Sequence, residues 1–158
     1  RPLVRAPLDL RDVIHTAVNG MARPLAEAKQ QTLCLSVPPA LPACRGDSSE
    51  LVVALQKILD NAVRYTPQNG RIDVIVEICP GAVQITVRDS GSGMDEATVQ
   101  AAFKRFYRLD LARTTSGFGL GLPIAQRIVE RHGGTLAITS APEAGTAVQI
   151  TLPVAFHG

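Results

Sequence analysis

The sequence has few cysteines, no long apolar run and no block of like charge, and each absence excludes a class of protein. Its three cysteines, Cys34, Cys44 and Cys79, are odd in number and lack CxxC spacing, which argues against a disulfide framework and against a zinc site. No apolar run approaches the ~18 to 20 residues that a membrane-spanning helix needs. Because the start at Arg1 shows no signal-peptide pattern either, we expect any membrane anchor of the parent protein to lie outside this chain.

The charge of the chain is nearly balanced, with 16 Lys and Arg against 14 Asp and Glu and a formal net charge of +2. Such a balance points to no nucleic-acid partner and to no membrane surface. Of the 158 residues, 46% are hydrophobic and 19% are charged, which is typical of a folded globular protein. We therefore expect residues 1–158 to form a single domain.

Residues 48–65 are expected to form a helix with one apolar and one polar face, and Asp47 or Ser48 is a suitable N-cap. The apolar face contains Leu51, Leu55, Ile58, Leu59 and Ala62. The polar face contains Lys57, Asp60, Asn61 and Arg64. The first face is expected to pack in the core, which leaves the second face available for a ligand.

The remaining periodicities predict a mixed α/β chain. Helical spacing favours a helix after Asp9 that extends towards Lys29, a short helix over 95–106, and a helix from about Leu120 that stops at Gly133 and Gly134. Strand patterns occupy residues 32–37, 72–78, 83–87, 135–139 and 146–152. About three long helices and about five strands predict a two-layer α/β (α+β) sandwich with a mixed sheet.

Two glycine-rich stretches, residues 89–93 and 117–121, could bring the backbone close to a phosphate group. Each stretch taken alone is equally compatible with an ordinary turn. Neither is followed by the Lys-Ser or Lys-Thr pair of a Walker motif, and neither has the GxGxxG spacing of a dinucleotide fold. The common nucleotide-binding folds are therefore poor fits.

Four motifs in a fixed order resemble those of sensor histidine kinases. Residues 59–67 (LDNAVRYTP) resemble the N box, and residues 89–93 (DSGSG) resemble the first glycine box. Residues 103–108 (FKRFYR) resemble the F box, and residues 117–122 (GFGLGL) resemble the second glycine box. The resemblance covers residues 47–152 and implies the Bergerat fold of the GHKL ATPase superfamily.

The resemblance implies ATP and Mg²⁺ as cofactors. Asn61 would coordinate Mg²⁺ through its amide oxygen, and Asp89 would accept a hydrogen bond from the adenine amino group. Arg64 and Arg108 would reach phosphates, and residues 103–121 would form a lid over the nucleotide. Further nucleotide contacts are implied for Tyr65, Gly91, Gly93, Met94, Tyr107, Gly117, Gly119, Leu120, Gly121, Leu122 and Thr146. Without the resemblance, Arg64 and Tyr65 would be read as a solvated charge and an ordinary aromatic residue at a helix end.

Lys57 departs from the family pattern, which usually has a second asparagine four residues before the Mg²⁺ ligand. This spacing puts Lys57 and Asn61 on one helix face, and a protonated ammonium group cannot ligate a metal. Lys57 therefore either contacts a phosphate or turns to solvent and leaves part of the Mg²⁺ site to water. In the gyrase, mismatch-repair and chaperone relatives a glutamate here activates water, which lysine cannot do, so phosphoryl transfer is favoured over hydrolysis. Lys104 similarly replaces an acidic residue of the F box.

None of His15, His132 and His157 lies in the context of a phospho-acceptor, which is an acidic residue and an Arg-Thr-Pro run after the histidine. We expect His15 to be a partly exposed helix residue and His132 to be a cation at a helix C-terminus. The histidine that receives the phosphoryl group is therefore expected on a dimerisation domain absent from this chain.

The resemblance thus implies a cytoplasmic catalytic domain that transfers the γ-phosphoryl group of ATP to this separate domain. The parent protein would be a homodimer anchored in the bacterial inner membrane, with a response regulator as its downstream partner. Two alternatives remain open at this point. One is a nucleotide-binding regulatory module with weakened transfer activity, and the other is a serine kinase of the anti-sigma type from the same superfamily.

Overall fold

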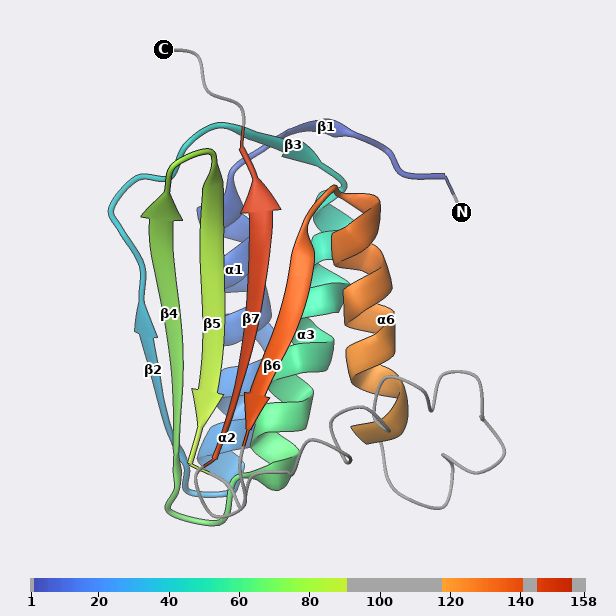
Figure 1. The fold of residues 1–158 in the computed structure, drawn as a ribbon. Coiled ribbons are helices and arrows are strands. Elements are labelled where there is room, and N and C mark those ends of the chain that lie inside the picture. Colours follow the sequence, from blue (N-terminus) through green and yellow to red (C-terminus); the bar gives the residue numbers. More distant parts are fainter. Residues whose placement is uncertain (1, 91–117, 141–144, 155–158) are drawn as a thin grey trace.

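A five-stranded mixed sheet forms one layer of the protein (Figure 1). The computed structural model describes residues 2–90, 118–140 and 145–154. The strands are β2 (Thr32–Ser36), β4 (Arg71–Cys79), β5 (Ala82–Asp89), β6 (Thr135–Ser140) and β7 (Thr146–Pro153), and their order in the sheet is β2-β4-β5-β7-β6. The β2–β4 pair is parallel and the other pairs are antiparallel. The expectation of a mixed sheet is therefore confirmed.

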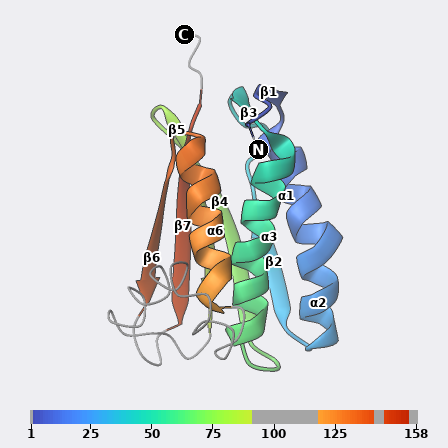
Figure 2. The same cartoon turned by 90° about the vertical axis from the view of Figure 1, so that its right-hand side faces the viewer.

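Helices cover one face of this sheet and form the second layer (Figure 2). They are α1 (Leu10–Ala17), the π-helical turn η1 (Val18–Ala22), α2 (Arg23–Ala28), α3 (Ser48–Tyr65) and α6 (Phe118–Arg131). The sequence predicts one helix where the structure has α1, η1 and α2 in succession. The π-turn contains the exposed Gly20, a residue that weakens an α-helix.

The polar residues expected to start two helices do so. The Asp9 carboxylate accepts a hydrogen bond from the Arg11 backbone N–H at 2.9 Å and caps α1. The Asp47 carboxylate accepts one from the Glu50 backbone N–H at 3.2 Å and caps α3. Each carboxylate satisfies an N–H group that has no partner inside its own helix.

The core lies between the helices and the inner face of the sheet. Alternate residues of β4 and β5 point into it, because successive side chains of a strand point to opposite faces. These are Ile72, Val74 and Val76 on β4 and Val83, Ile85 and Val87 on β5, all buried. The expected apolar face of α3 packs against them, and all five of its residues are buried. The helical pattern therefore correctly separates the core face of α3 from its polar face.

A second, two-stranded sheet was not expected from the sequence. Strands β1 (Ala6–Leu8) and β3 (Cys44–Gly46) pair in antiparallel register. Three residues are too few to show an alternating pattern, so no sequence signal marks them. The segment before β1 is tied down as well, because the Val4 backbone N–H donates to Asp47 Oδ2 at 3.0 Å and the Arg5 guanidinium donates to the Arg131 carbonyl at 2.8 Å.

The interpretation of His132 as a helix-end cation is wrong. The side chain is only 5% exposed, and its Nε2 accepts a hydrogen bond from the Asp47 backbone N–H at 3.0 Å. A nitrogen that accepts a hydrogen bond carries no proton, so the ring is neutral and its Nδ1–H donates to the Ile128 carbonyl at 2.8 Å. His132 thus joins the end of α6 to the start of α3. His15, by contrast, is half-buried on α1, as expected.

Candidate functional site

Elements that carry three of the four motifs meet at one end of the sandwich (Figure 1). Helix α3 ends there, β5 ends there, and β7 and α6 begin there. In the β5–β7 register Asp89 lies directly opposite Thr146. Both residues are 9% exposed. Two residues that are 57 positions apart in the sequence are thus brought side by side, as a common ligand would require.

The last turns of α3 bring Asn61, Arg64 and Tyr65 to this end. The helix stops at Tyr65 because Thr66 takes an extended conformation, which the following Pro67 favours. Asn61 is 9% exposed, Arg64 is exposed, and Tyr65 is 36% exposed. Within the described ranges the Asn61 amide makes no hydrogen bond to another residue. Its oxygen therefore fits the role of a Mg²⁺ ligand, whose other ligands would come from phosphates and water.

Asp89 is held at the end of β5 by contacts of its neighbour Ser90. The Ser90 backbone N–H donates to the Arg71 carbonyl at 3.1 Å, and Ser90 Oγ accepts from the Arg71 backbone N–H at 2.9 Å. Gly70 packs closely beside these two hydrogen bonds, because a Cβ there would lie 2.4 Å from Thr66 Cγ2 and 3.1 Å from Ser90 Oγ. The end of α3 and the end of β5 are therefore held in contact through this glycine.

Gly145 supports Asp89 from the other side, and we predict that Gly145→Ala disrupts the site. The residue has φ of +80°, and an added Cβ would lie 2.2 Å from the Asp89 carbonyl oxygen. A strained backbone and a clash with main chain together are expected to cost about 2 kcal/mol or more of unfolding free energy. Urea denaturation and ATP titration would measure both losses. Gly20→Ala is the control, because nothing lies within 4 Å of a Cβ at Gly20. Equal ATP affinity in the Gly145 variant would contradict the assignment of Asp89.

The beginning of α6 packs against α3 beside Lys57. A Cβ at Gly121 would lie 3.6 Å from the Lys57 carbonyl oxygen and 3.9 Å from Lys57 Cβ. Gly121 of the second glycine box therefore lies beside α3, one turn before Asn61 of the N box. The Leu122 side chain is fully buried at 0% exposure. Any nucleotide contact of Leu122 would therefore come from its backbone.

Several expected site residues lie outside the described part of the chain. They are Gly91, Gly93, Met94, Tyr107, Arg108 and Gly117, and the expected helix over 95–106 and most of the expected lid lie there as well. Gly119 and Leu120 belong to the first turn of α6. The roles implied for all of these residues stay predictions.

The described residues contain neither a membrane-spanning helix nor a cluster of metal-binding side chains. No helix among them has the length and the apolar character needed to cross a bilayer. They also contain no group of three or more His, Cys, Asp or Glu side chains that could hold a metal ion.

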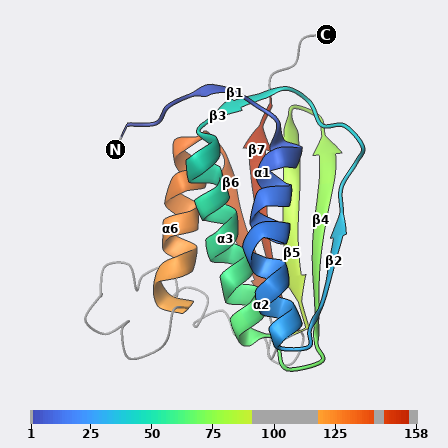
Figure 3. The same ribbon diagram turned by 180° about the vertical axis from the view of Figure 1, so that it is seen from behind.

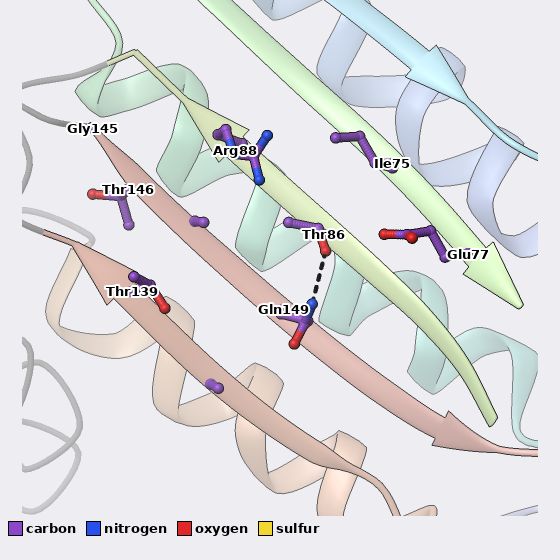
Figure 4. A pocket seen from close by; sticks show the side chains of 10 residues that line it. Ile75, Glu77, Thr86, Arg88, Thr139, Gly145, Thr146 and Gln149 are labelled. Carbon is purple, nitrogen blue, oxygen red and sulfur yellow. Dashed lines mark hydrogen bonds between the residues drawn. The ribbon is translucent and has the colours of Figure 1, made fainter. Parts of the chain in front are cut away.

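A separate hollow of about 450 Å³ lies on the outer face of the sheet, away from the helices (Figure 4). Gln149 Nε2 donates to Thr86 Oγ1 at 3.2 Å within it. The residues that line the hollow are Ile75, Glu77, Thr86, Arg88, Ala137, Thr139, Gly145, Thr146, Ala147 and Gln149. Along each strand the side chains that line the hollow alternate with the side chains that point into the core, so the hollow and the core lie on opposite faces of the sheet. The hollow therefore lies across the sheet from Asn61 and Lys57 of the N-box helix. It meets the candidate site only at one end, where Gly145 and Thr146 line it.

Residues 46–155 match the model of a protein family described as histidine kinase-, DNA gyrase B-, and HSP90-like ATPase. The chain is 36% identical over 128 residues to the adaptive-response sensory kinase SasA of Synechococcus elongatus, with 80% of this chain and 33% of that protein covered. The chain thus spans about a third of the length of the curated relatives that it matches.

Two solved structures show the same fold with appreciable identity. The mycobacterial sensor histidine kinase MprB is 32% identical with a TM-score of 0.78, and the match covers 95% of this chain and 97% of that one. Full-length ShkA in complex with AMPPNP is 26% identical with a TM-score of 0.80, and the match covers 100% of this chain and 33% of that one. The architecture expected from periodicity is therefore confirmed.

Proposed function

Because the chain belongs to the histidine kinase-, DNA gyrase B-, and HSP90-like ATPase family, we propose that it binds Mg²⁺·ATP and delivers the γ-phosphoryl group to a histidine of a separate dimerisation domain. One observation carries the proposal. Asn61 of the N box, Asp89 of the first glycine box and Gly121 of the second lie on different elements that meet at one end of the sandwich.

Each residue has a chemical task that suits its place. The Asp89 carboxylate, at the end of β5, accepts a hydrogen bond from the exocyclic amine of adenine. Asn61 offers an amide oxygen to Mg²⁺, which when bound neutralises phosphate charge. Arg64, one turn further along α3, holds a phosphate. Phosphoryl transfer needs mainly positioning and charge stabilisation from the protein, and these residues supply both.

The proposal is tested by supplying the missing acceptor. The chain is mixed with labelled ATP and a dimerisation domain from a histidine kinase relative, and acid-labile, alkali-stable phosphate on the acceptor is measured. We expect transfer to the acceptor histidine and little turnover by the chain alone. Phosphate on a histidine of this chain itself, or release of phosphate to water at the same rate with and without acceptor, would contradict it.

The wider setting of this domain is proposed together with the function. Full-length ShkA binds AMPPNP, and this chain matches a third of that protein. From the resemblance to sensor histidine kinases we propose a homodimeric parent with a response regulator downstream, this domain in the cytoplasm, and an anchor in the bacterial inner membrane. The anti-sigma-type serine kinase is disfavoured, because MprB, which is 32% identical to this chain, is a sensor histidine kinase.

Lys57 and Lys104 are the two features that favour a regulatory module with weakened transfer. Lys104 lies outside the described residues, and the effect of Lys57 can be measured. Lys57 is half-buried on α3, one turn before Asn61 and next to the start of α6. Lys57→Asn exchanges a positive charge for a possible metal ligand. The ratio of the ATP affinity with Mg²⁺ to the ATP affinity without it is therefore expected to be about tenfold larger in the variant than in the wild type. Titrations over a range of Mg²⁺ concentrations test this, and superimposable curves would refute a role for Lys57 near the phosphates.

A further inference from the structure

Helix α3 points its C-terminal end at the candidate site, and a lysine from another element caps that end. Lys29 Nζ donates hydrogen bonds to the carbonyl oxygens of Val63 at 2.8 Å, Arg64 at 3.3 Å and Thr66 at 3.1 Å. An ammonium group has three protons, so these bonds use all of them. The sequence motifs contain no sign of this contact, because Lys29 lies 34 residues before Val63.

The carbonyl groups in question are those that a helix leaves unsatisfied. The last four carbonyls of an α-helix have no N–H partner further along the same helix. In α3 the Ala62 carbonyl is satisfied by the Thr66 backbone N–H at 3.0 Å. Lys29 Nζ donates hydrogen bonds to the Val63 and Arg64 carbonyls of α3 and to the Thr66 carbonyl just beyond the helix. Most of the exposed negative end of α3 is thus covered by one cation.

Gln31 caps the same end without a charge. Its Nε2 donates to the Val63 carbonyl at 2.9 Å and to the Thr66 carbonyl at 2.6 Å. Its side chain is 6% exposed, while that of Lys29 is half-buried. Two neighbouring residues therefore make comparable contacts with α3 and differ chiefly in charge. This pair separates the effect of the hydrogen bonds from the effect of the positive charge.

Both residues are fixed in place by the turn that joins α2 to β2. The Lys29 backbone N–H bonds to the Leu25 and Ala26 carbonyls, and Gln30 takes a positive φ of 59°. The start of β2 is tied to the loop after α3, since the Thr32 backbone N–H donates to the Gly70 carbonyl at 2.9 Å. The ends of α2 and α3 lie side by side (Figure 3). The cation is therefore held there by the fold.

A helix C-terminus carries about half a negative charge, which repels an anion bound near it. The last turns of α3 also contain Asn61 and Arg64, the residues assigned to the metal and the phosphates. We propose that Lys29 is a positioning residue of the nucleotide site that offsets the negative end of α3 and so favours the binding of a triphosphate. This inference rests on the proposed function, because it concerns the phosphates of ATP.

The test compares Lys29→Met with Gln31→Met in the whole chain. For each variant the affinity for ATP, ADP and adenosine and the midpoint of thermal unfolding are measured. Both variants lose hydrogen bonds to α3, so both are expected to unfold at lower temperature. Lys29→Met alone is expected to bind ATP about fivefold more weakly relative to adenosine, with ADP between them. Lys29→Arg keeps the charge and is expected to recover most of that ratio.

The outcomes separate this inference from the function on which it rests. If the wild-type chain does not bind ATP, the proposed function fails, and the inference fails with it. If the wild type binds ATP but Lys29→Met keeps the wild-type ratio of ATP to adenosine affinity, only the inference is overturned. The same holds if Gln31→Met changes the ratio as much as Lys29→Met, because the contacts to α3 and not the charge would then be responsible.

Discussion

Replacing Asp89 by asparagine is expected to weaken ATP binding about 10- to 100-fold. The carboxylate is 9% exposed at the end of β5, where it would accept a hydrogen bond from the adenine amine. A hydrogen bond to a charged group contributes about 1.5 to 3 kcal/mol, which corresponds to that loss. An amide can also donate a hydrogen bond to the O6 atom of guanine. The Asp89→Asn variant is therefore expected to discriminate less between ATP and GTP, which titration of both nucleotides would show.

The neighbouring Arg88 supplies the control for this experiment. Arg88 is exposed on the outer face of the sheet and lines the hollow of Figure 4, across the sheet from the helices. Arg88→Gln should leave both affinities within about twofold of the wild type, since surface substitutions away from a site have small effects. Unchanged ATP affinity and unchanged base preference in Asp89→Asn would remove the central residue of the proposed site.

Asn61→Ala is expected to lower phosphoryl transfer to a supplied acceptor domain by about a hundredfold or more. The amide oxygen is the one metal ligand assigned to the described residues, and loss of a group that stabilises transition-state charge typically costs a factor of this size. Affinity for ATP in the absence of Mg²⁺ should change little, because the adenine contacts are untouched. Transfer rates with and without Mg²⁺, together with titrations in chelator, measure the two effects.

Asp60→Ala is the matched control, because Asp60 precedes Asn61 on the same helix and is exposed. It should transfer phosphate at nearly the wild-type rate. The assignment of Asn61 would be contradicted if its alanine variant kept full Mg²⁺-dependent transfer. It would also be contradicted if Asn61→Ala lost ATP affinity equally with and without Mg²⁺, since a metal ligand matters only when the metal is present.

Local sequence patterns predict the parts of this fold that depend on local physics. The apolar face of α3 and its Asp47 N-cap are predicted from a segment of about 20 residues, and the structure contains both. The alternating strands are equally local, and their pairing follows the hydrophobic face. Strands β1 and β3 are too short to show a period, and the π-turn at Val18–Ala22 interrupts a helix that its side chains would continue.

Contacts between distant segments could not be predicted in the same way. The local sequence predicts His132 as a cation at a helix end. The structure shows instead that its ring accepts a hydrogen bond from the backbone N–H of Asp47, 85 residues earlier. No local pattern marks Lys29, whose ammonium group donates hydrogen bonds to carbonyl groups at the end of α3. The motifs imply a common site for Asn61 and Asp89, and these residues lie on elements that meet at one end of the sandwich, where Asp89 lies opposite Thr146. The motifs do not indicate what holds these residues there, because side chains far away in the sequence do so.

The most direct test of the account is a binding titration of the wild-type chain with ATP and GTP, with and without Mg²⁺. A site built from Asp89 and Asn61 predicts tighter binding of ATP than of GTP, and a Mg²⁺ effect on the triphosphate that adenosine does not show. Equal affinity for ATP and GTP, or no binding of either with Mg²⁺ present, would contradict the central claim that this end of the sandwich is an adenine nucleotide site.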